Sequence, residues 1–490
     1  MHSQNQKNKP VILIALTIVF VILLSHFLSG VNILGYSVKP VDLFMDIEPD
    51  SLISYNNFNK VNSLEYTFSK LFPDQNKKLH VEALTGSVSL DLIRSLIDGE
   101  HKNRQIANLS SETEEYQVPP TNNVPITGNL SQMKYFFDAL KKSGSEKIRI
   151  AHYGDSGVEG DAITANIRED FQQKFGGKGV GFLSITSQDI TFRTTTKESF
   201  SNNWSSSSVV TGNPKNMPLG INGELAIPQG ESWVNYQTTS WMPYLKSFNM
   251  ARVFYSNAKP STVYYSFNNN SNQSAILQPG NTLKELKLSA PGGSAESFKL
   301  TTTFANQAYF YGVSLEDGNG VYVDNFPWRG NTGLGFTNIP ESSFIQFGNM
   351  LNYKLIILEF GANETSFSSS KNTWYANQMV KVINNLKKAF PQTSILLIGV
   401  GDRGIKRGTR FITDPNVPLL LKVQQDIANR TGIAFWNLFE AMGGYGAMEK
   451  WVSANPPLAL MDYTHPSWQG SAKLGDMIAN AILQTYYNYK

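Results

Sequence analysis

Apolar strand-like runs alternate with amphipathic helix-like segments over the carboxyl-terminal part of this chain. From about residue 354 to the end, runs such as Leu355–Leu358 and Ile395–Ile398 are separated by segments whose apolar residues recur every three or four positions. Fully apolar runs of this length are typical of strands that are covered on both faces of a parallel sheet. A similar strand lies far upstream, at 148–154. The alternation predicts an α/β fold with a doubly wound parallel sheet and helices on both faces.

Between about residues 199 and 320 the pattern changes to short alternating runs, separated by serine, asparagine, glycine and threonine. Trp233–Tyr236 and Val253–Tyr255 are examples, and no convincing helix appears between them. This pattern indicates a β-sandwich that interrupts the α/β domain. We therefore expect five parts in chain order: a membrane anchor or signal segment (1–35), an amino-terminal arm and linker (36–128), the first part of the α/β domain (129–198), the inserted β-sandwich (199–320) and the second part of the α/β domain (321–490).

The amino-terminal segment predicts export. Val11 to about Val31 is almost wholly apolar, and Lys7 and Lys9 precede it. About 20 apolar residues can span a bilayer, and the flanking lysines favour an amino terminus kept in the cytoplasm. A signal peptide cleaved near Ser29–Gly30 is the alternative, but the apolar run is long for one. With either an anchor or a signal peptide, we expect the rest of the chain in the periplasm or cell envelope. If the segment is not cleaved, residues 11–31 or so anchor the protein in the inner membrane.

Composition excludes several kinds of chemistry. The net charge is only +3 and no basic run dominates, so we do not expect nucleic acid as a partner. The chain has no cysteine, which excludes disulfides, cysteine-ligated zinc, a lipid-modified cysteine and a thiol nucleophile. The charged fraction of 17% is low and the aromatic fraction of 12% is high, a balance typical of secreted or sugar-handling proteins.

The strand at 148–154 runs directly into a Gly-Asp-Ser turn, and a helix-like stretch follows. A serine at a strand-to-helix turn is exposed at the carboxyl edge of a sheet. Backbone N–H groups there can meet a developing oxyanion. Because Gly-Asp-Ser is also an ordinary turn, Ser156 is a candidate nucleophile only if the chain supplies the other groups that catalysis needs.

Acyl transfer from a serine needs a base and a group that orients this base. Of the six histidines, five lie in less suitable places: His2, His26, His80 and His101 before the α/β pattern, and His152 within the strand that precedes Ser156. His465 remains, on a loop that leads into the last helix, with Asp462 three residues earlier. The Asp462 carboxylate can hold one imidazole nitrogen while the other faces the serine. A lone Asp-x-x-His is more often a capped loop, so this structural interpretation stays open.

Two loops could supply the oxyanion donors. Asn363 follows shortly after the buried strand Leu355–Leu358, in Gly361-Ala-Asn363-Glu364, and its amide can donate a hydrogen bond at the sheet edge. Gly330 lies in a glycine-rich loop, Trp328 to Gly333, whose backbone can approach a substrate oxygen closely. Either loop by itself would be an ordinary turn.

This ordered set of four blocks resembles the SGNH (GDSL-type) hydrolase superfamily, over about 130–198 and 320–490. The resemblance implies an SGNH-hydrolase-like sheet of flavodoxin-like strand order and a reaction that needs no cofactor and no metal. It also implies these roles: Ser156 as nucleophile, His465 as base, Asp462 as its orienting group, the Ser156 and Gly330 N–H groups with the Asn363 amide as oxyanion hole, and Gly154, Asp155 and Gly361 as supporting residues. Two positions depart from the pattern. Glu364 stands where many members have Asp, and Gly157 where the most similar subfamily often has His.

That subfamily is the exported peptidoglycan O-acetylesterase type, in which a carbohydrate-binding-like β module interrupts the catalytic domain. The similarity implies a serine esterase that removes O-acetyl groups from a cell-envelope polysaccharide. An O-acetyltransferase that uses the same acyl-enzyme and an inactive glycan-binding wall protein are the alternatives.

Further side chains are candidates for substrate contact. Arg329 and Arg403 could line the cleft and meet an acidic group of the substrate, although arginines in such loops are more often structural or solvent contacts. Aromatic residues of the predicted insert could stack on sugar rings or face the sandwich core: Trp233, Tyr236, Trp241, Tyr264 and Tyr265.

Overall fold

The structure is a computed structural model, and it describes residues 123–187, 190–213, 215–303 and 307–489. It also describes the backbone of two short antiparallel strands, β1 (Asn32–Ile33) and β2 (Tyr36–Ser37). The chain divides into two units, 1–113 and 114–490, and the fold below is that of the second. The apolar segment at 11–31 lies outside the described residues. Within the described ranges, no helix is both long enough and apolar enough to cross a membrane.

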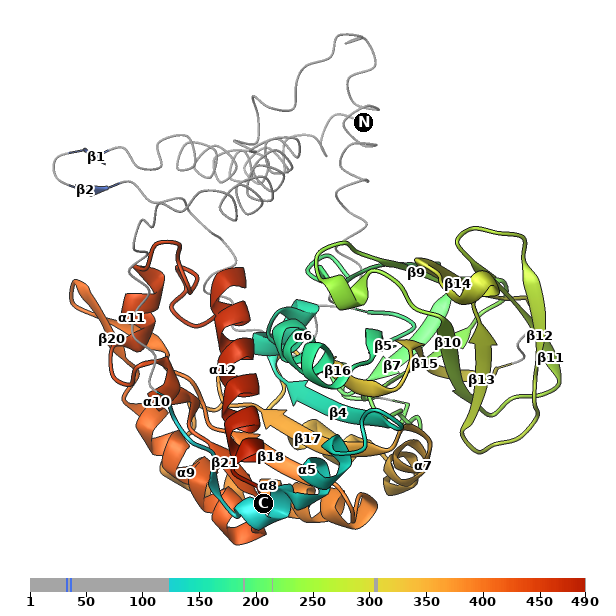
Figure 1. The fold of residues 1–490 in the computed structure, drawn as a ribbon. Coiled ribbons are helices and arrows are strands. Elements are labelled where there is room, and N and C mark those ends of the chain that lie inside the picture. The colour runs from blue at the N-terminus through green and yellow to red at the C-terminus, as the bar shows by residue number, and fades with distance from the viewer. Residues whose placement is uncertain are drawn as a thin grey trace, which may run out of the picture. The chain divides into compact units, whose positions relative to one another are not determined.

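A six-stranded mixed sheet forms the centre of this unit, with the strand order β16-β4-β17-β18-β21-β3 (Figure 1). Its five parallel strands are β4 (Lys147–Gly154), β16 (Gly320–Pro327), β17 (Tyr353–Glu359), β18 (Ser394–Ile398) and β21 (Ala434–Trp436). β3 (Thr127–Gly128) pairs antiparallel with β21 at one edge. The α/β class is therefore confirmed, whereas the sheet is mixed rather than wholly parallel. β3 also lies at the end of the segment that the sequence predicted to be a linker.

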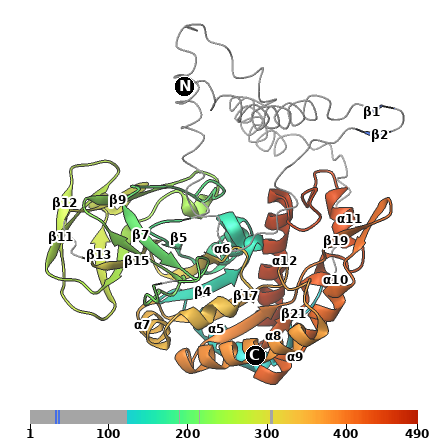
Figure 2. The same cartoon turned by 180° about the vertical axis from the view of Figure 1, so that it is seen from behind.

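Helices cover both faces of this sheet (Figures 1 and 2). Alternate strand residues such as Ile357 pack in one core and Ile356 in the other, because neighbouring side chains of a strand point to opposite faces. The first core holds α5 (Lys134–Leu140), α6 (Ala162–Phe175), α10 (Leu438–Met442), α11 (Ala447–Val452) and α12 (Trp468–Tyr487). The second holds α7 (Glu341–Leu351), α8 (Ser369–Ala389) and α9 (Asn416–Thr431).

Local sequence explains where several of these helices begin and end. The Ser368 and Ser467 hydroxyls accept hydrogen bonds from the first turns of α8 and α12, the usual role of a serine at a helix start. Gly432, with a φ of 61°, ends α9 in the left-handed conformation that glycine adopts without strain.

Two antiparallel sheets lie between β5 (Lys178–Leu183) and β16 in the chain. One has the order β12-β11-β14-β9-β6 and the other β13-β10-β15-β8-β7, with β5 paired to β15. Side chains from both sheets, such as Phe298 and Phe310, share one core, so the two sheets form a sandwich. The strands are β6 (Thr196–Phe200), β7 (Trp204–Ser208), β8 (Glu224–Pro228), β9 (Ser232–Thr238), β10 (Met250–Ser256), β11 (Ser261–Phe267), β12 (Gln273–Leu277), β13 (Lys284–Ser289), β14 (Ser297–Thr302) and β15 (Tyr309–Asp317). That this region is a separate carbohydrate-binding module stays a prediction.

Because the carboxyl ends of parallel strands share one edge of the sheet, the loops that follow β4, β16 and β17 lie near one another. The hairpin of β19 (Gly404–Arg407) and β20 (Arg410–Thr413) follows β18. The remaining short elements are 3-10 helices: η1 (Leu130–Met133), η2 (Ser156–Asp161), η3 (Pro243–Leu245), η4 (Pro291–Gly293) and η5 (Leu334–Asn338).

Candidate active site

Ser156 is the first residue of η2, directly after β4 and the intervening Asp155. The Asp155 carboxylate accepts a hydrogen bond of 2.9 Å from the N–H of Gly157, which fixes the start of this short helix. Gly154 allows the tight turn, because a Cβ there would lie 2.7 Å from a Val158 methyl and 2.9 Å from the Glu359 carbonyl oxygen. The turn therefore has no room for a Cβ at position 154, and the Asp155 carboxylate caps the helix that follows.

Ser156, His465 and Asp462 form a hydrogen-bonded chain. The Oγ of Ser156 lies 2.9 Å from Nε2 of His465. Nδ1 of His465 lies 2.7 Å from Oδ2 of Asp462. The other Asp462 oxygen accepts hydrogen bonds of 3.0 Å from the N–H groups of Thr464 and His465. Partial burial opposes ionisation of Asp462, but the hydrogen bonds from His465 and Thr464 outweigh it and lower its pKa. The aspartate is thus held as an anion against the ring.

Gly330 and Asn363 lie in the same pocket as Ser156 and His465, which has a volume of about 420 Å³. Gly330 has a φ of 71°, a left-handed conformation that glycine adopts without strain. Within the described part of the chain, no group accepts a hydrogen bond from its N–H. The Asn363 amide nitrogen donates 3.1 Å to the Asn331 carbonyl and lies 3.4 Å from the Asp155 carboxylate. The sequence blocks thus meet in one pocket, with N–H donors on its wall.

Two further carboxyl groups lie buried near this pocket. Burial, and then the neighbouring charge of Glu359, raise the pKa of Asp155 to about 6 despite its hydrogen bond from Gly157. Burial, and then the charge of Asp155, raise the pKa of Glu364 to about 8. At neutral pH Glu364 therefore holds its proton more readily than Asp155. The glutamate that departs from the superfamily pattern is an interior group next to Asn363, with a side chain closed off from solvent.

His152 lies beneath this site and makes two hydrogen bonds. Its Nε2 is 2.9 Å from the Glu359 carboxylate, and its Nδ1 is 2.9 Å from the Thr164 hydroxyl. The imidazole is fully buried, so it supports the strand ends from inside the fold. Glu359 was not among the sequence candidates. The signal that could have found it is a carboxylate at the last position of an otherwise apolar strand.

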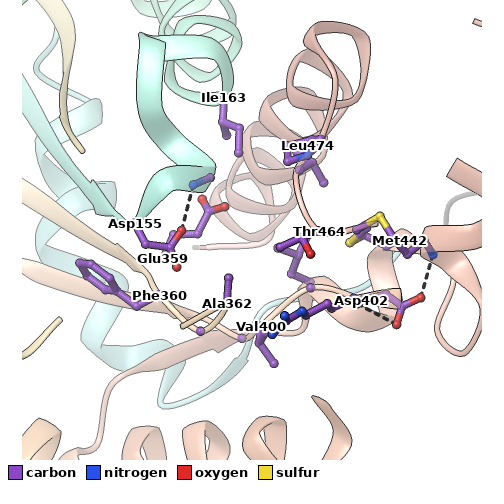
Figure 3. A pocket seen from close by; sticks show the side chains of 18 of the residues that line it. Asp155, Ile163, Glu359, Phe360, Ala362, Val400, Asp402, Met442, Thr464 and Leu474 are labelled. Carbon is purple, nitrogen blue, oxygen red and sulfur yellow. Dashed lines mark hydrogen bonds between the residues drawn. The ribbon is translucent and has the colours of Figure 1, made fainter. Parts of the chain in front are cut away.

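A second cavity, of about 80 Å³, is bounded by Thr464 and Pro466, the chain neighbours of His465. Figure 3 shows the polar and apolar side chains around it: Asp155, Glu359, Asp402 and Thr464 together with Ile163, Val400, Met442 and Leu474. This cavity shares Gly157 and Pro466 with the Ser156 pocket, but Ser156 itself does not line it.

The two candidate arginines lie in different places. Arg329 lines the Ser156 pocket, with a side chain that is 63% exposed and an Nη1 that lies 3.5 Å from the Glu159 carboxylate. Arg403 lines the second cavity and donates a hydrogen bond to the Thr365 hydroxyl. The structure therefore brings Arg329, but not Arg403, into the pocket with the serine.

The chain thus combines a mixed sheet, covered by helices on both faces, with a hydrogen-bonded serine, histidine and aspartate on its loops. A solved structure described as "Peptidoglycan O-acetylesterase in action, 5 min" shares this fold, with a TM-score of 0.61 and 18% identity. That alignment covers 75% of this chain and 100% of that chain. At this identity the similarity shows the fold alone.

Other solved structures align more loosely. A family two carbohydrate esterase from Cellvibrio japonicus aligns with a TM-score of 0.26 and 10% identity, over 60% of this chain and 100% of that chain. A family two carbohydrate esterase with a carbohydrate-binding domain, from Corynascus thermopiles, aligns with a TM-score of 0.27 and 10% identity, over 52% and 94%. These scores are too low for a structural inference. The sequence matches no protein-family model and no curated protein.

Proposed function

We propose that this protein is a serine esterase that removes O-acetyl groups from a cell-envelope polysaccharide of the peptidoglycan type. The observation that carries the proposal is the chain of hydrogen bonds from Ser156 through His465 to Asp462, which opens onto the pocket that Gly330 and Asn363 also line. The fold shared with a structure described as a peptidoglycan O-acetylesterase supports the choice of ester and polymer.

In the first half of the reaction, the Ser156 oxygen attacks the acetyl carbonyl carbon while Nε2 of His465 takes the hydroxyl proton. The carbonyl oxygen becomes an oxyanion that accepts hydrogen bonds from the Ser156 N–H, the Gly330 N–H and the Asn363 amide. His465 then returns the proton to the sugar oxygen as the ester C–O bond breaks. The products are the free sugar hydroxyl and an acetyl group bound to Ser156.

In the second half, a water molecule gives a proton to His465 and attacks the acetyl-serine. The same donors hold the second oxyanion. When it collapses, the bond between the acetyl carbon and the Ser156 oxygen breaks and His465 returns its proton to that oxygen, which restores the serine and releases acetic acid, ionised to acetate at neutral pH. Asp462 stabilises the imidazolium that forms in both halves and keeps the ring in the orientation that faces Ser156. The Asn331 carbonyl holds the Asn363 amide in place through one N–H, and the other N–H, which makes only a 3.4 Å contact to Asp155, turns to the oxyanion when the substrate is bound.

Arg329 is proposed to contact an acidic group of the substrate. Its guanidinium is largely exposed at the mouth of the Ser156 pocket and lies next to Gly330 in the chain. Guanidinium groups bind carboxylates well because their N–H donors match the two oxygens. Because Nη1 of Arg329 lies 3.5 Å from the Glu159 carboxylate, a substrate anion can compete with Glu159 for the guanidinium.

The site of action is proposed to be the cell envelope, with residues 11–31 as the membrane anchor. The support is the long apolar run that follows Lys7 and Lys9. Fractionation of cells that express the full chain tests this: we expect the protein with the inner membrane, and recovery in the cytosol would contradict it.

The experiment that tests the function is acetate release from O-acetylated peptidoglycan by the full chain, with chemically de-O-acetylated peptidoglycan as the control substrate. A parallel reaction contains an acetyl donor and a de-O-acetylated glycan acceptor. The proposal expects free acetate in the first reaction and little acetylated glycan in the second. Acetylated glycan as the main product would identify a transferase instead, and no acetate would contradict the proposal.

A further inference from the structure

Two exposed aromatic side chains stand on the wall of the Ser156 pocket. Phe192 is 51% exposed and Trp468 is 42% exposed, and both line the pocket together with Ser156 and His465. Leu460, which is 49% exposed, lines it as well. Large apolar side chains left open to solvent around a pocket with polar reacting groups mark a ligand-binding surface.

Trp468 is held in place at the first position of α12, just after His465. The Ser467 hydroxyl accepts a hydrogen bond of 3.1 Å from the Gly470 N–H and so fixes this helix start. Trp241, from the loop between β9 and η3 of the sandwich, meets Trp468 edge to face, with ring centroids 6.1 Å apart and planes at 79°. Such pairs favour one orientation of the two rings. The sandwich therefore supports a side chain of the pocket wall.

Phe192 is held against the serine turn itself. A Cβ on Gly160, in the same short helix as Ser156, would lie 3.0 Å from the Phe192 carbonyl oxygen, so the two backbones are in close contact. Nearby, the Thr195 hydroxyl donates 2.6 Å to the buried Asp161 carboxylate. The segment that carries Phe192 is thus fastened to η2, next to the residue that carries the reacting hydroxyl.

We propose that Phe192 and Trp468, with Trp241 behind Trp468, form a sugar-binding strip that holds a polymeric glycan across the Ser156 pocket. Flat aromatic faces bind the apolar C–H faces of pyranose rings, while the hydroxyl groups stay free for polar contacts. Two such side chains from separate elements suit a chain of several sugar residues better than a single acetyl ester. The inference rests on the proposed function, because it assumes that the ester is carried by a glycan.

This placement differs from the one that the sequence suggested for the insert. Tyr236 faces the sandwich core and donates 2.6 Å to the Ser184 carbonyl, and Trp233 and Tyr265 are half-buried. Among the aromatic residues named from the sequence, Trp241 is the one that contacts a pocket-lining side chain. The insert thereby contributes to substrate binding at the active site.

The kinetic test compares two substrates, O-acetylated peptidoglycan and 4-nitrophenyl acetate, with the full chain and four variants. For Trp468→Ala and Phe192→Ala, kcat/KM on the polymer should fall at least about 10-fold, through KM, as is typical when an aromatic binding contact is removed. On 4-nitrophenyl acetate both variants should stay within about two-fold of the parent. Trp374→Ala is the matched control, because Trp374 is 49% exposed on α8 and does not line the pocket.

An equal loss of kcat/KM on both substrates would contradict the proposed sugar-binding strip, since it would mean that these rings hold the catalytic groups in position. Unchanged activity on the polymer would overturn it as well. Trp468→Phe separates misfolding from lost binding, because it keeps an aromatic face and should retain most of the polymer activity.

A binding measurement distinguishes failure of the strip from failure of the proposed function. The Ser156→Ala protein is mixed with insoluble de-O-acetylated peptidoglycan and sedimented, so that no reaction is involved. When Trp468→Ala or Phe192→Ala is combined with Ser156→Ala in one chain, a smaller fraction of the protein should sediment with the peptidoglycan. Combining Trp374→Ala with Ser156→Ala should leave that fraction unchanged. An unchanged fraction with the strip variants would contradict the inference even if the parent protein is an active esterase.

Discussion

The Oγ of Ser156 and the Nε2 of His465 lie 2.9 Å apart, although 309 positions separate the two residues in the chain. The serine is placed by the turn after β4, and the histidine by the loop that ends in the cap of α12. Since neither segment alone makes a site, the chemistry depends on the sheet and on the packing of α6 against α12 that bring them together. Substitutions at single positions test the parts of this arrangement one at a time.

Asn363→Ala should lower kcat on an acetyl ester by about 10²–10³-fold, because removing one oxyanion donor typically costs about 2.7–4 kcal/mol of transition-state stabilisation. KM should change little, since the contact forms with the oxyanion and not with the ground-state carbonyl. Steady-state kinetics on 4-nitrophenyl acetate measure both. Asn384→Ala, at an exposed position of α8, is the matched control and should behave like the parent. If Asn363 only stabilises the fold, Asn363→Ala would have a normal kcat and a lower free energy of unfolding.

Asp462→Asn should lower kcat by roughly 10⁴-fold while the fold stays intact. The neutral amide cannot stabilise the imidazolium, and it can hold His465 in the tautomer that does not accept the Ser156 proton. The comparison is with Asp426→Asn, which removes a surface carboxylate that pairs with Arg430. If the two variants have the same turnover, Asp462 is only the cap of its loop.

Gly154→Ala should destabilise the protein by roughly 1–3 kcal/mol, the usual cost of forcing an extra carbon into a filled interior. The added Cβ would meet the Val158 side chain and the Glu359 backbone, which are held by the strand and by η2. Urea unfolding measures the change in the free energy of unfolding. In Gly144→Ala, the control, nothing lies within 4 Å of the new carbon. Equal stability of the two variants would mean that the turn relaxes without cost.

The stability of the parent protein should fall as the pH rises from about 4.5 to about 8, in part because of Glu364. Burial raises the pKa of this group from its ordinary value of 4.5 to about 8 in the folded chain. Between pH 4.5 and about pH 8, the folded state holds a proton on Glu364 that the unfolded state has lost. The favourable contribution of Glu364 to the free energy of unfolding is therefore fully present below pH 4.5 and is lost as the pH rises to about 8. Glu364→Gln, which stays neutral, should flatten this dependence.

Urea unfolding of the parent and of Glu364→Gln at pH 5 and pH 8 measures the difference. Glu341→Gln serves as the control, because Glu341 is an exposed residue in the first turn of α7. The same fall in stability for all three proteins would show that Glu364 does not carry its proton in the folded state.

Much of the site could be predicted because its parts have local signals. Gly154 ends an apolar strand and Ser156 follows it, Asn363 follows another strand, and Asp462 and His465 are close in sequence. The carboxyl ends of parallel strands must share one sheet edge, so the meeting of the serine and the asparagine was predictable from the strand pattern alone. The α/β class followed from the same alternation.

Other features depend on contacts that a single sequence does not reveal. Arg403 was a candidate for the pocket, but the path of the chain after β18 places it at the second cavity, where it donates to Thr365. A strand pattern also cannot say which face is inside, so Tyr236 could not be assigned to the core in advance. The contact of Trp241 with Trp468 joins the sandwich to α12, and neither residue carries a signal for it.

The most direct test of the account is acetate release from O-acetylated peptidoglycan by Ser156→Ala beside the parent chain, with Ser453→Ala as the exposed-serine control. The account predicts a loss of at least about 10⁴-fold for Ser156→Ala, as expected when the nucleophile of a hydrogen-bonded set is removed. It also predicts an unchanged rate for Ser453→Ala. Release of acetate by Ser156→Ala at the parent rate would contradict the central claim that Ser156 carries the acetyl group.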